Sequence, residues 1–173
     1  LSPKSHMERS IVINAPASAI FAQINTLKNV NNWQPWGKQD PNIKISYEGP
    51  ESGVGSKMNW ESEKMGNGSQ WIIESIPDKH VKTGMQFGDM GGTNSSDINL
   101  ETVEGGTKVT WTYDGDVTGS GVAMAAMGKI VNLFIDGMIG KDYEAGLNNL
   151  KKLAESQPQE QTTAPADSTQ QKK

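Results

Sequence analysis

The chain has 173 residues, of which 34% are hydrophobic, with a net charge of −4 at pH 7 and a sequence pI of about 5.2. This length suffices for one domain with its own core, and the thin spread of Lys and Arg argues against nucleic acid as a partner. The sequence has no cysteine, which excludes disulfides and thiolate chemistry, and no apolar run long enough to span a bilayer.

The composition divides the chain into three parts. Residues 1–6, LSPKSH, are expected to form an N-terminal stub or linker, which contains His6. Residues 155–173 are rich in Gln, Thr, Ser and Pro and have no large apolar side chain, so we expect a disordered tail. An ordered domain over residues 7–154 remains.

The first part of this domain predicts a strand followed by two short helices. In ERSIVINAP, Ile11 and Ile13 recur at every second position, which is typical of a strand. Pro16 suits the first turn of a helix, and apolar residues then follow at helical spacing, at positions 20, 21, 24 and 27. A spacing of three residues that ends at Trp33 predicts a second short helix, which Pro35 ends.

The remainder predicts an antiparallel sheet and a long helix. Turn-forming residues recur between residues 43 and 117, and the segments between them are rich in Thr, Val, Ile and Trp, which indicates about six strands joined mostly by hairpins. After Gly119-Ser120-Gly121, apolar residues at helical spacing from Met127 to Ala154 predict a long helix that packs against the sheet.

This order of elements resembles the START and polyketide cyclase (SRPBCC) superfamily, in particular its bacterial polyketide cyclase/dehydrase-like members. The segments that carry the resemblance are ERSIVINAPASAIFAQI with NNWQPW, GVGSKMNWES, and FIDGMIGKDYEAGLNNLKKLAE. The resemblance implies an α+β helix-grip fold, in which a curved antiparallel sheet of about seven strands wraps the C-terminal helix. It also places Trp33 and Trp36 where the short helices close one end of the sheet.

Strand parity predicts which side chains face the long helix, because alternate residues of a strand point to the same side. The residues expected to point inward are Met58, Trp60, Val81, Thr83, Met85, Phe87, Ile98, Leu100, Thr102, Val109, Trp111 and Tyr113. Those then expected to face solvent are Glu61, His80, Asp97, Glu101 and Asp114. In SQWIIESIP two alternatives stay open, in which the inward residues are either Trp71 and Ile73 or Ile72, Glu74 and Ile76.

The sequence offers little material for catalysis. It has no nucleophile elbow, no P-loop and no metal-ligand spacing, and His80 is expected to be a solvated residue in or beside a turn. We therefore predict no catalytic residue, no metal and no other cofactor. The candidate ligand-binding residues are the large inward side chains, three side chains of the long helix, and the Trp71 and Glu74 alternatives: Met58, Trp60, Trp71, Glu74, Met85, Phe87, Trp111, Tyr113, Met127, Phe134 and Met138. The same residue types would also fill a solid core.

The resemblance implies that the domain binds a hydrophobic or lipid-like small molecule between sheet and helix, without catalysis. Two alternatives stay open: a polyketide cyclase or aromatase enzyme that uses Glu74 and Tyr113, and a protein-interaction module of the heat-shock-protein activator type. Similar bacterial proteins often carry a hydrophobic segment just before the first strand. On that basis we favour a membrane-anchored domain, whose anchor lies outside this chain, over a cytoplasmic protein.

Overall fold

The computed structural model describes residues 4–88, 93–116 and 128–157. Seven antiparallel strands form one curved sheet in the order β1-β7-β6-β5-β4-β3-β2. The strands are β1 (Lys4–Ile13), β2 (Lys44–Glu48), β3 (Lys57–Glu61), β4 (Gly68–Ile76), β5 (His80–Phe87), β6 (Thr93–Val103) and β7 (Gly106–Asp116). The helices are α1 (Ala17–Ile24), α2 (Leu27–Trp33), α3 (Trp36–Gln39) and α5 (Gly128–Ser156).

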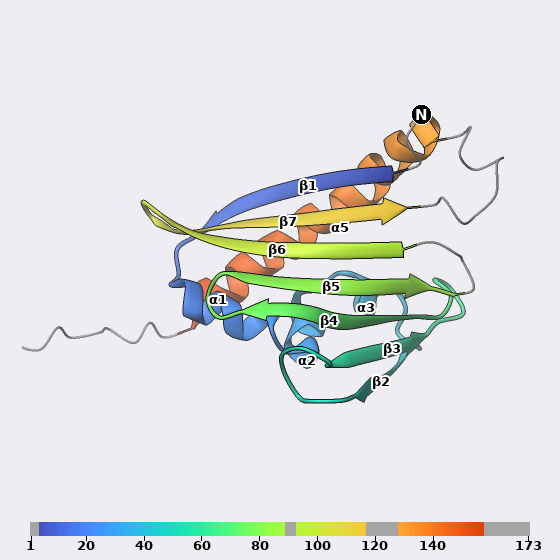
Figure 1. The fold of residues 1–173 in the computed structure, drawn as a ribbon, viewed down its shortest axis with the longest axis horizontal. Helices are drawn as coiled ribbons and strands as arrows, with labels where there is room; N and C mark the ends of the chain where they lie inside the picture. Colours follow the sequence, from blue (N-terminus) through green and yellow to red (C-terminus); the bar gives the residue numbers. More distant parts are fainter. Residues whose placement is uncertain (1–3, 89–92, 117–127, 158–173) are drawn as a thin grey trace, which may run out of the picture.

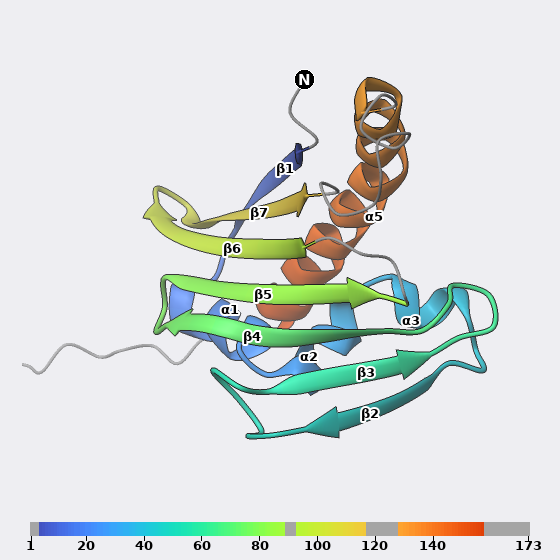
Figure 2. The same cartoon turned by 45° about the vertical axis from the view of Figure 1, so that its right-hand side comes forward.

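The four helices of the described residues lie on the same side of the sheet (Figures 1 and 2), so the sheet has an inner face toward these helices and an outer face away from them. The long helix α5 crosses this inner face, and the helix-grip fold expected from the sequence is confirmed. None of the described helices is both long and apolar enough to cross a membrane.

The predicted turn residues take up the backbone conformations that tight turns require. Gly53, Gly55, Gly66 and Gly105 have φ angles of 77°, 91°, 78° and 87°, and Asp78 has a φ of 59°. Such positive φ angles are accessible to glycine at little cost and are tolerated by Asp or Asn. The strands on either side of these turns therefore end where the sequence indicated.

The boundaries at the two ends of the domain differ from the expected ones. Strand β1 begins at Lys4 rather than at residue 7, because Ser5 and Met7 alternate onto the inner face, where both are buried. His6 therefore belongs to the sheet, and its Nδ1 lies 2.6 Å from Oδ1 of Asp114. Helix α5 continues to Ser156, and the rest of the expected tail, residues 158–173, lies outside the described residues.

The sequence left open which side chains of β4 point inward. A β-bulge in this strand gives an arrangement that neither alternative anticipated. Ile72 is buried on the inner face, whereas Ile73 is 46% exposed on the outer face. The pairing with β5 then shifts between Ile72 and Glu74, so Glu74 and Ile76 also lie exposed instead of following Ile72 inward. A bulge inserts one extra residue, and this reverses the facing of the residues beyond it in the strand.

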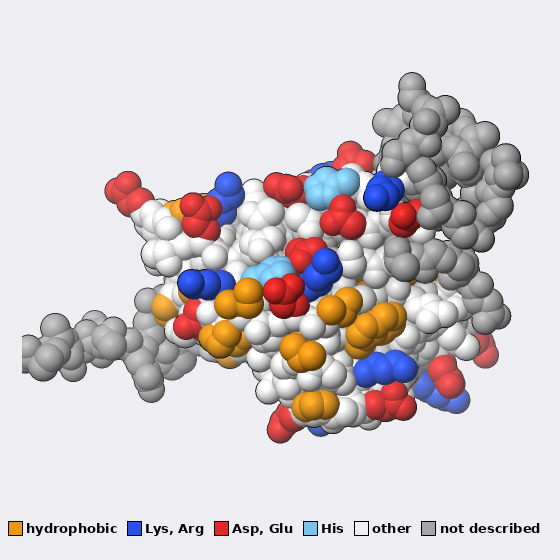
Figure 3. Space-filling model, viewed as in Figure 1, with side chains coloured by type: hydrophobic (Ala, Val, Ile, Leu, Met, Phe, Trp, Pro, Cys, Tyr) orange, Lys and Arg blue, Asp and Glu red, His pale blue; other side chains and the backbone are white. Residues whose placement is uncertain are grey.

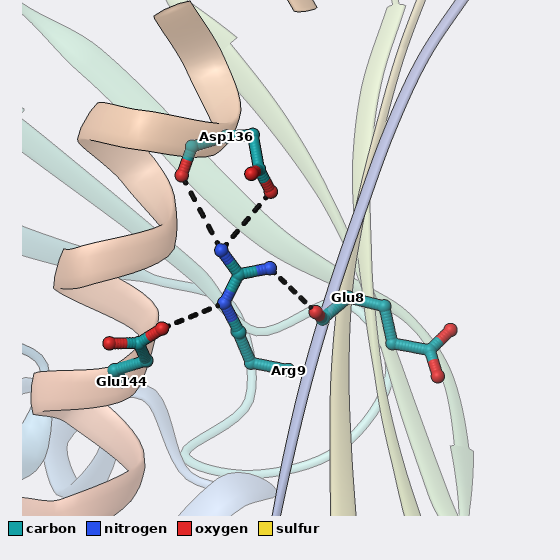
Figure 4. Close-up of polar contacts among 4 residues, drawn as sticks. All are labelled: Glu8, Arg9, Asp136 and Glu144. Carbon is teal, nitrogen blue, oxygen red and sulfur yellow. Dashed lines mark hydrogen bonds and ion pairs between the residues drawn. The ribbon is translucent and has the colours of Figure 1, made fainter. Parts of the chain in front are cut away.

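The contact between β1 and α5 depends on Arg9, which bridges the two elements (Figure 4). Its guanidinium donates to Oε1 of Glu144 at 3.0 Å, to Oδ1 of Asp136 at 3.1 Å and to the backbone carbonyl of Glu8 at 2.9 Å. Gly140 makes room for this arrangement, because a Cβ atom there would collide with the guanidinium. The helix can therefore lie close to the first strand.

Candidate functional site: a cavity between the sheet, the short helices and the long helix

A cavity of about 180 Å³ lies between the inner face of the sheet, the short helices and α5. Its wall is mostly apolar and aromatic, with three amide side chains. The lining residues are Asn31, Gln34, Trp36, Gly37, Ile43, Ile45, Met58, Trp60, Met65, Gln70, Met85, Phe87, Tyr113, Ile139 and Tyr143.

The strands contribute two rows of cross-strand neighbours to this wall. In the first row, Gln70 on β4 lies between Met58 on β3 and Met85 on β5. In the second row, Gly68 lies between Trp60 and Phe87, whose rings have their centroids 6.1 Å apart. A Cβ atom at Gly68 would collide with the Trp60 ring, so this glycine lets the indole lie against β4.

The two tryptophans of NNWQPW have different roles. Trp33 is fully buried, its indole nitrogen donates to the carbonyl of Gln23 at 3.0 Å, and its ring meets Trp111 edge-on at 5.1 Å. Trp36 begins α3 and lines the cavity, with its ring edge-on to Tyr143 at 6.1 Å. The two residues were expected to close one end of the sheet together. In the structure Trp33 belongs to the core, whereas Trp36 belongs to the wall of the cavity.

Buried tyrosines close the cavity toward β6 and β7. The Tyr143 ring stacks on Trp111 at 3.6 Å, and its hydroxyl lies 3.3 Å from Oγ of Ser96. The single Ser96 hydroxyl proton is donated to the carbonyl of Thr112 at 2.7 Å, so Tyr143 is the donor in the bond to Ser96. Burial raises the pKa of both Tyr143 and Tyr113, so both phenols stay neutral at pH 7.

The polar contact of Tyr113 is made within the protein. Its hydroxyl donates to Oδ1 of Asn94 on β6 at 2.6 Å. Within the described lining, the titratable side chains are these two tyrosines, with no carboxylate or imidazole among them. The wall can therefore offer hydrogen bonds but carries no formal charge there.

The segment that follows Trp36 forms one wall of the cavity and is fastened at both ends. Asp142 on α5 accepts hydrogen bonds from Nε1 of Trp36 at 3.0 Å and from Nε2 of Gln39 at 3.4 Å. Asp40 is buried and accepts from Oγ of Ser62, beyond the end of β3, at 2.7 Å. Helix α3 was not expected from the sequence, because four residues are too few to show a helical period.

Five of the predicted ligand-binding residues line the cavity: Met58, Trp60, Met85, Phe87 and Tyr113. Trp111 is 2% exposed and lies behind Tyr143, outside the lining. Met127 lies outside the described residues, and so do the side chains of Phe134 and Met138, although their backbone belongs to α5.

Trp71 and Glu74 lie on the outer face of the sheet, which corrects their expected place in the site. The Trp71 indole covers Gly84 on the neighbouring strand, where a Cβ atom would come within 2.6 Å of the ring. Glu74 lies just after the bulge, and its side chain is 53% exposed, with a carboxylate oxygen 4.0 Å from Nδ1 of His80.

His80 lies beside a turn, as expected, but as the first residue of β5 on the outer face its side chain is largely buried rather than solvated. Its Nε2 lies 2.6 Å from Oδ1 of Asp97, and acidic side chains lie beside both histidines on this face (Figure 3). The outward facing of His80 and Asp97 agrees with strand parity, and their mutual contact accounts for their burial. No group of three or more potential metal ligands occurs among the residues that the structure describes.

Sequence reasoning missed the amides Asn31, Gln34 and Gln70. Gln34 and Gln70 are only 7% and 8% exposed, although glutamine is usually a surface residue. Gln70 has the same facing as Ile72, so a confident inward assignment of Ile72 would have found it. For Gln34 no local signal existed, because it lies at the C-terminal cap of α2, where neither the helical nor the strand period of apolar residues applies.

Comparisons with known proteins agree with this architecture. A family model described as polyketide cyclase / dehydrase and lipid transport matches residues 4–155. Protein CV1439 from Chromobacterium violaceum is 15% identical with a TM-score of 0.59, over 88% of this chain and 99% of that one. The di-domain ARO/CYC protein StfQ from the steffimycin biosynthetic pathway is 8% identical with a TM-score of 0.66, over 88% of this chain and 51% of that one.

A third similar structure is the Aha1 dimer from Colwellia psychrerythraea, at 23% identity and a TM-score of 0.55, over 87% of this chain and 96% of that one. A search of curated proteins finds no match to this sequence. At these identities the structural likenesses show a shared fold.

Proposed function

Because this chain belongs to the family of polyketide cyclases, dehydrases and lipid-transport proteins, we propose that it binds an apolar small molecule in the cavity between the sheet and α5. The observation that carries the proposal is the cavity itself, with its wall of aromatic, Met and Ile side chains. Binding sites for small molecules are typically concave and mostly apolar, with a few polar groups that fix orientation.

The side chains of the wall suit a ligand that is held by burial. Met58 and Met85 face each other across Gln70 and have flexible, polarizable thioethers that adapt to the shape of a guest. Trp36, Trp60 and Phe87 offer large aromatic surfaces. Transfer of an apolar molecule from water onto such a wall is favourable at roughly 25 cal/mol per Å² of buried apolar surface.

The cyclase alternative with Glu74 and Tyr113 has less support. It needs both groups in one cavity, whereas Tyr113 lines the cavity and Glu74 lies on the other face of the sheet. The Tyr113 hydroxyl is also engaged with Asn94. The geometry of the described residues therefore supports binding better than acid–base chemistry by this pair.

The test fills the cavity and asks whether binding is lost. N-phenyl-1-naphthylamine is uncharged and fluoresces strongly in apolar surroundings, so we expect saturable, one-to-one binding to the wild type when the probe is excited directly. Met85→Trp places a larger side chain in the cavity and should weaken this binding at least tenfold. Gln86→Trp is the matched control, because Gln86 is the next residue of β5 and is exposed on the outer face.

Folding of each variant is checked by circular dichroism and thermal unfolding. Non-saturable probe fluorescence with the wild type would contradict the proposal. Equal loss of binding in the Met85 and Gln86 variants would also contradict it, because the probe would then not occupy the inner cavity.

A further inference from the structure

Two buried glutamines from different elements line the cavity. Gln34 follows α2, Gln70 lies in the middle of β4, and each is more than nine-tenths buried. Both line an otherwise largely apolar cavity. A buried amide is costly to keep unless its donor and acceptor groups are used.

The side-chain amide of Gln34 has no partner within the described part of the chain. Its backbone N–H donates to the carbonyl of Val30 at 3.0 Å, but its side chain forms no hydrogen bond there. Among the described residues, no partnerless side-chain nitrogen or oxygen is sealed off from open space. The Gln34 amide must therefore reach open space, and the space it lines is the cavity.

Gln70 is partly satisfied, which leaves it with free hydrogen-bonding capacity. Its Nε2 donates to Oγ1 of Thr83 at 3.3 Å, a long bond. One amide hydrogen and the amide oxygen remain unused among the described residues. Together the two glutamines offer both donors and acceptors to a guest.

The described wall of the cavity does not provide a counter-charge. No Lys, Arg, Asp or Glu occurs among its described lining residues. Arg9 is engaged by Glu144, Asp136 and the Glu8 carbonyl (Figure 4), and the ammonium of Lys28 lies over the Tyr47 ring. A charged guest would therefore lose its hydration without gaining an ion pair, which is strongly unfavourable.

We propose that the cavity selects uncharged ligands that carry a hydroxyl or carbonyl group, and that the amides of Gln34 and Gln70 recognise this group. The inference rests on the proposed function and names the class of ligand for the same cavity. A hydroxyl group can donate to an amide oxygen and accept from an amide N–H, whereas a carbonyl oxygen accepts from an amide N–H. Either group can therefore bond to these glutamines without a charge. The cavity volume of about 180 Å³ and the aromatic rings around it suit a small ring system.

Three naphthalenes that differ in one substituent test this selectivity: 2-naphthol, naphthalene and 2-naphthoate. Dissociation constants are measured by isothermal titration calorimetry at pH 7 with the full chain. We expect 2-naphthol to bind about 3- to 10-fold more tightly than naphthalene, the effect of one or two net hydrogen bonds. The 2-naphthoate anion should bind at least tenfold more weakly than 2-naphthol, because its charge is unpaired in the cavity.

The acid also provides an internal control for charge, because it becomes neutral when protonated. If the cavity admits the uncharged form, the apparent affinity for 2-naphthoate should rise about tenfold for each pH unit lowered toward the pKa of the acid. Affinity for 2-naphthol over the same pH range should stay constant. A carboxylate that binds as well as 2-naphthol at pH 7 would overturn the inference.

Substitution of the glutamines tests their role in recognition. Gln34→Leu and Gln70→Leu remove the amide at similar size, and each should weaken 2-naphthol binding about 3- to 10-fold while naphthalene binding stays unchanged. The control is Gln86→Leu, the same change at an exposed position of the outer face. This control should alter neither 2-naphthol binding nor naphthalene binding. Thermal unfolding verifies that each variant is folded. If one of the two glutamine variants does not fold, binding to the other variant tests the role of the amides.

The outcomes separate this inference from the proposed function. If none of the three naphthalenes binds the wild type and N-phenyl-1-naphthylamine also fails, the proposed function is wrong. If all three bind with equal affinity and neither glutamine variant changes that, the cavity binds apolar molecules but the inferred selectivity is wrong.

Discussion

At the scale of single residues, the environments of Trp33 and Trp36 differ more than their closeness in the chain would suggest. Trp33 is fully buried and is held by its own indole bond to Gln23 and by a bond from Asn149 to its carbonyl. Trp36 is half-buried and divides its contacts between Asp142, two neighbouring rings and the cavity. Replacement of each residue should therefore affect different properties.

We expect Trp33→Ala to lower the free energy of unfolding by roughly 3–5 kcal/mol, because removal of a fully buried ring leaves a cavity in the core. Trp36→Ala should cost less stability, because part of its surface is already open, but it should weaken binding of N-phenyl-1-naphthylamine. Urea unfolding and probe titration measure the two effects. An equal loss of stability in both variants, with probe binding intact in Trp36→Ala, would contradict the distinction.

At the scale of elements, α5 contains glycines at positions where an ordinary helix would gain stability from alanine. Gly146 lies against Trp111, and a Cβ atom there would come within 2.9 Å of the indole and 3.5 Å of Pro35. Gly140 faces the Arg9 guanidinium. At Gly137, by contrast, nothing lies within 4 Å of the Cβ position. Gly140 and Gly146 thus allow close approach of the helix to its neighbours, whereas Gly137 does not serve this purpose.

The pair Gly137→Ala and Gly146→Ala separates helix propensity from packing. Gly137→Ala should stabilise the protein by about 0.5–1 kcal/mol, because alanine favours the helix and meets no neighbour. Gly146→Ala gains the same propensity but must displace a stacked indole, so we expect a net destabilisation of roughly 1–3 kcal/mol. Chemical denaturation measures both, and stabilisation by Gly146→Ala would show that the helix can move away from β7 at little cost.

At the scale of the whole molecule, stability depends on pH through carboxylates that gain partners on folding. Asp40 is an example, because hydrogen bonds from Ser62 and from the backbone N–H of Asn42 lower its pKa below the ordinary value of 3.8. A carboxyl group with a lowered folded-state pKa stabilises the fold above its unfolded-state pKa. That stabilisation is lost as the pH falls through the lower, folded-state pKa.

We expect Asp40→Asn to be less stable than the wild type at pH 7, because an amide is a weaker acceptor for the Ser62 hydroxyl than a carboxylate. The difference should shrink as the pH is lowered below 3.8, where the wild type begins to lose its own carboxylate. Thermal unfolding as a function of pH measures this. A difference that is independent of pH would mean that the charge of Asp40 does not contribute to the contact.

The sequence by itself determined the order and type of the elements over most of the domain. Periods of two and 3.6 residues are local properties of a strand and a helix, and turn residues act within a few positions. The inward residues of β3, β5 and β7, such as Trp60, Met85 and Tyr113, were therefore predictable from alternation alone and face the cavity as expected. At β1 the pattern was too weak to show that the strand begins at Lys4.

Features that only the tertiary structure decided depend on neighbours that are distant in the chain. The bulge between Ile72 and Glu74 arises from pairing with β5 and puts Glu74 outside. Gln34 is buried because separate elements enclose the end of α2, which no local period shows. Gln70 faces inward together with Ile72, and the strand alternation left that facing open. Whether apolar side chains leave a cavity or fill it is likewise a matter of how separate elements pack, since a solid core and a binding site use the same residue types.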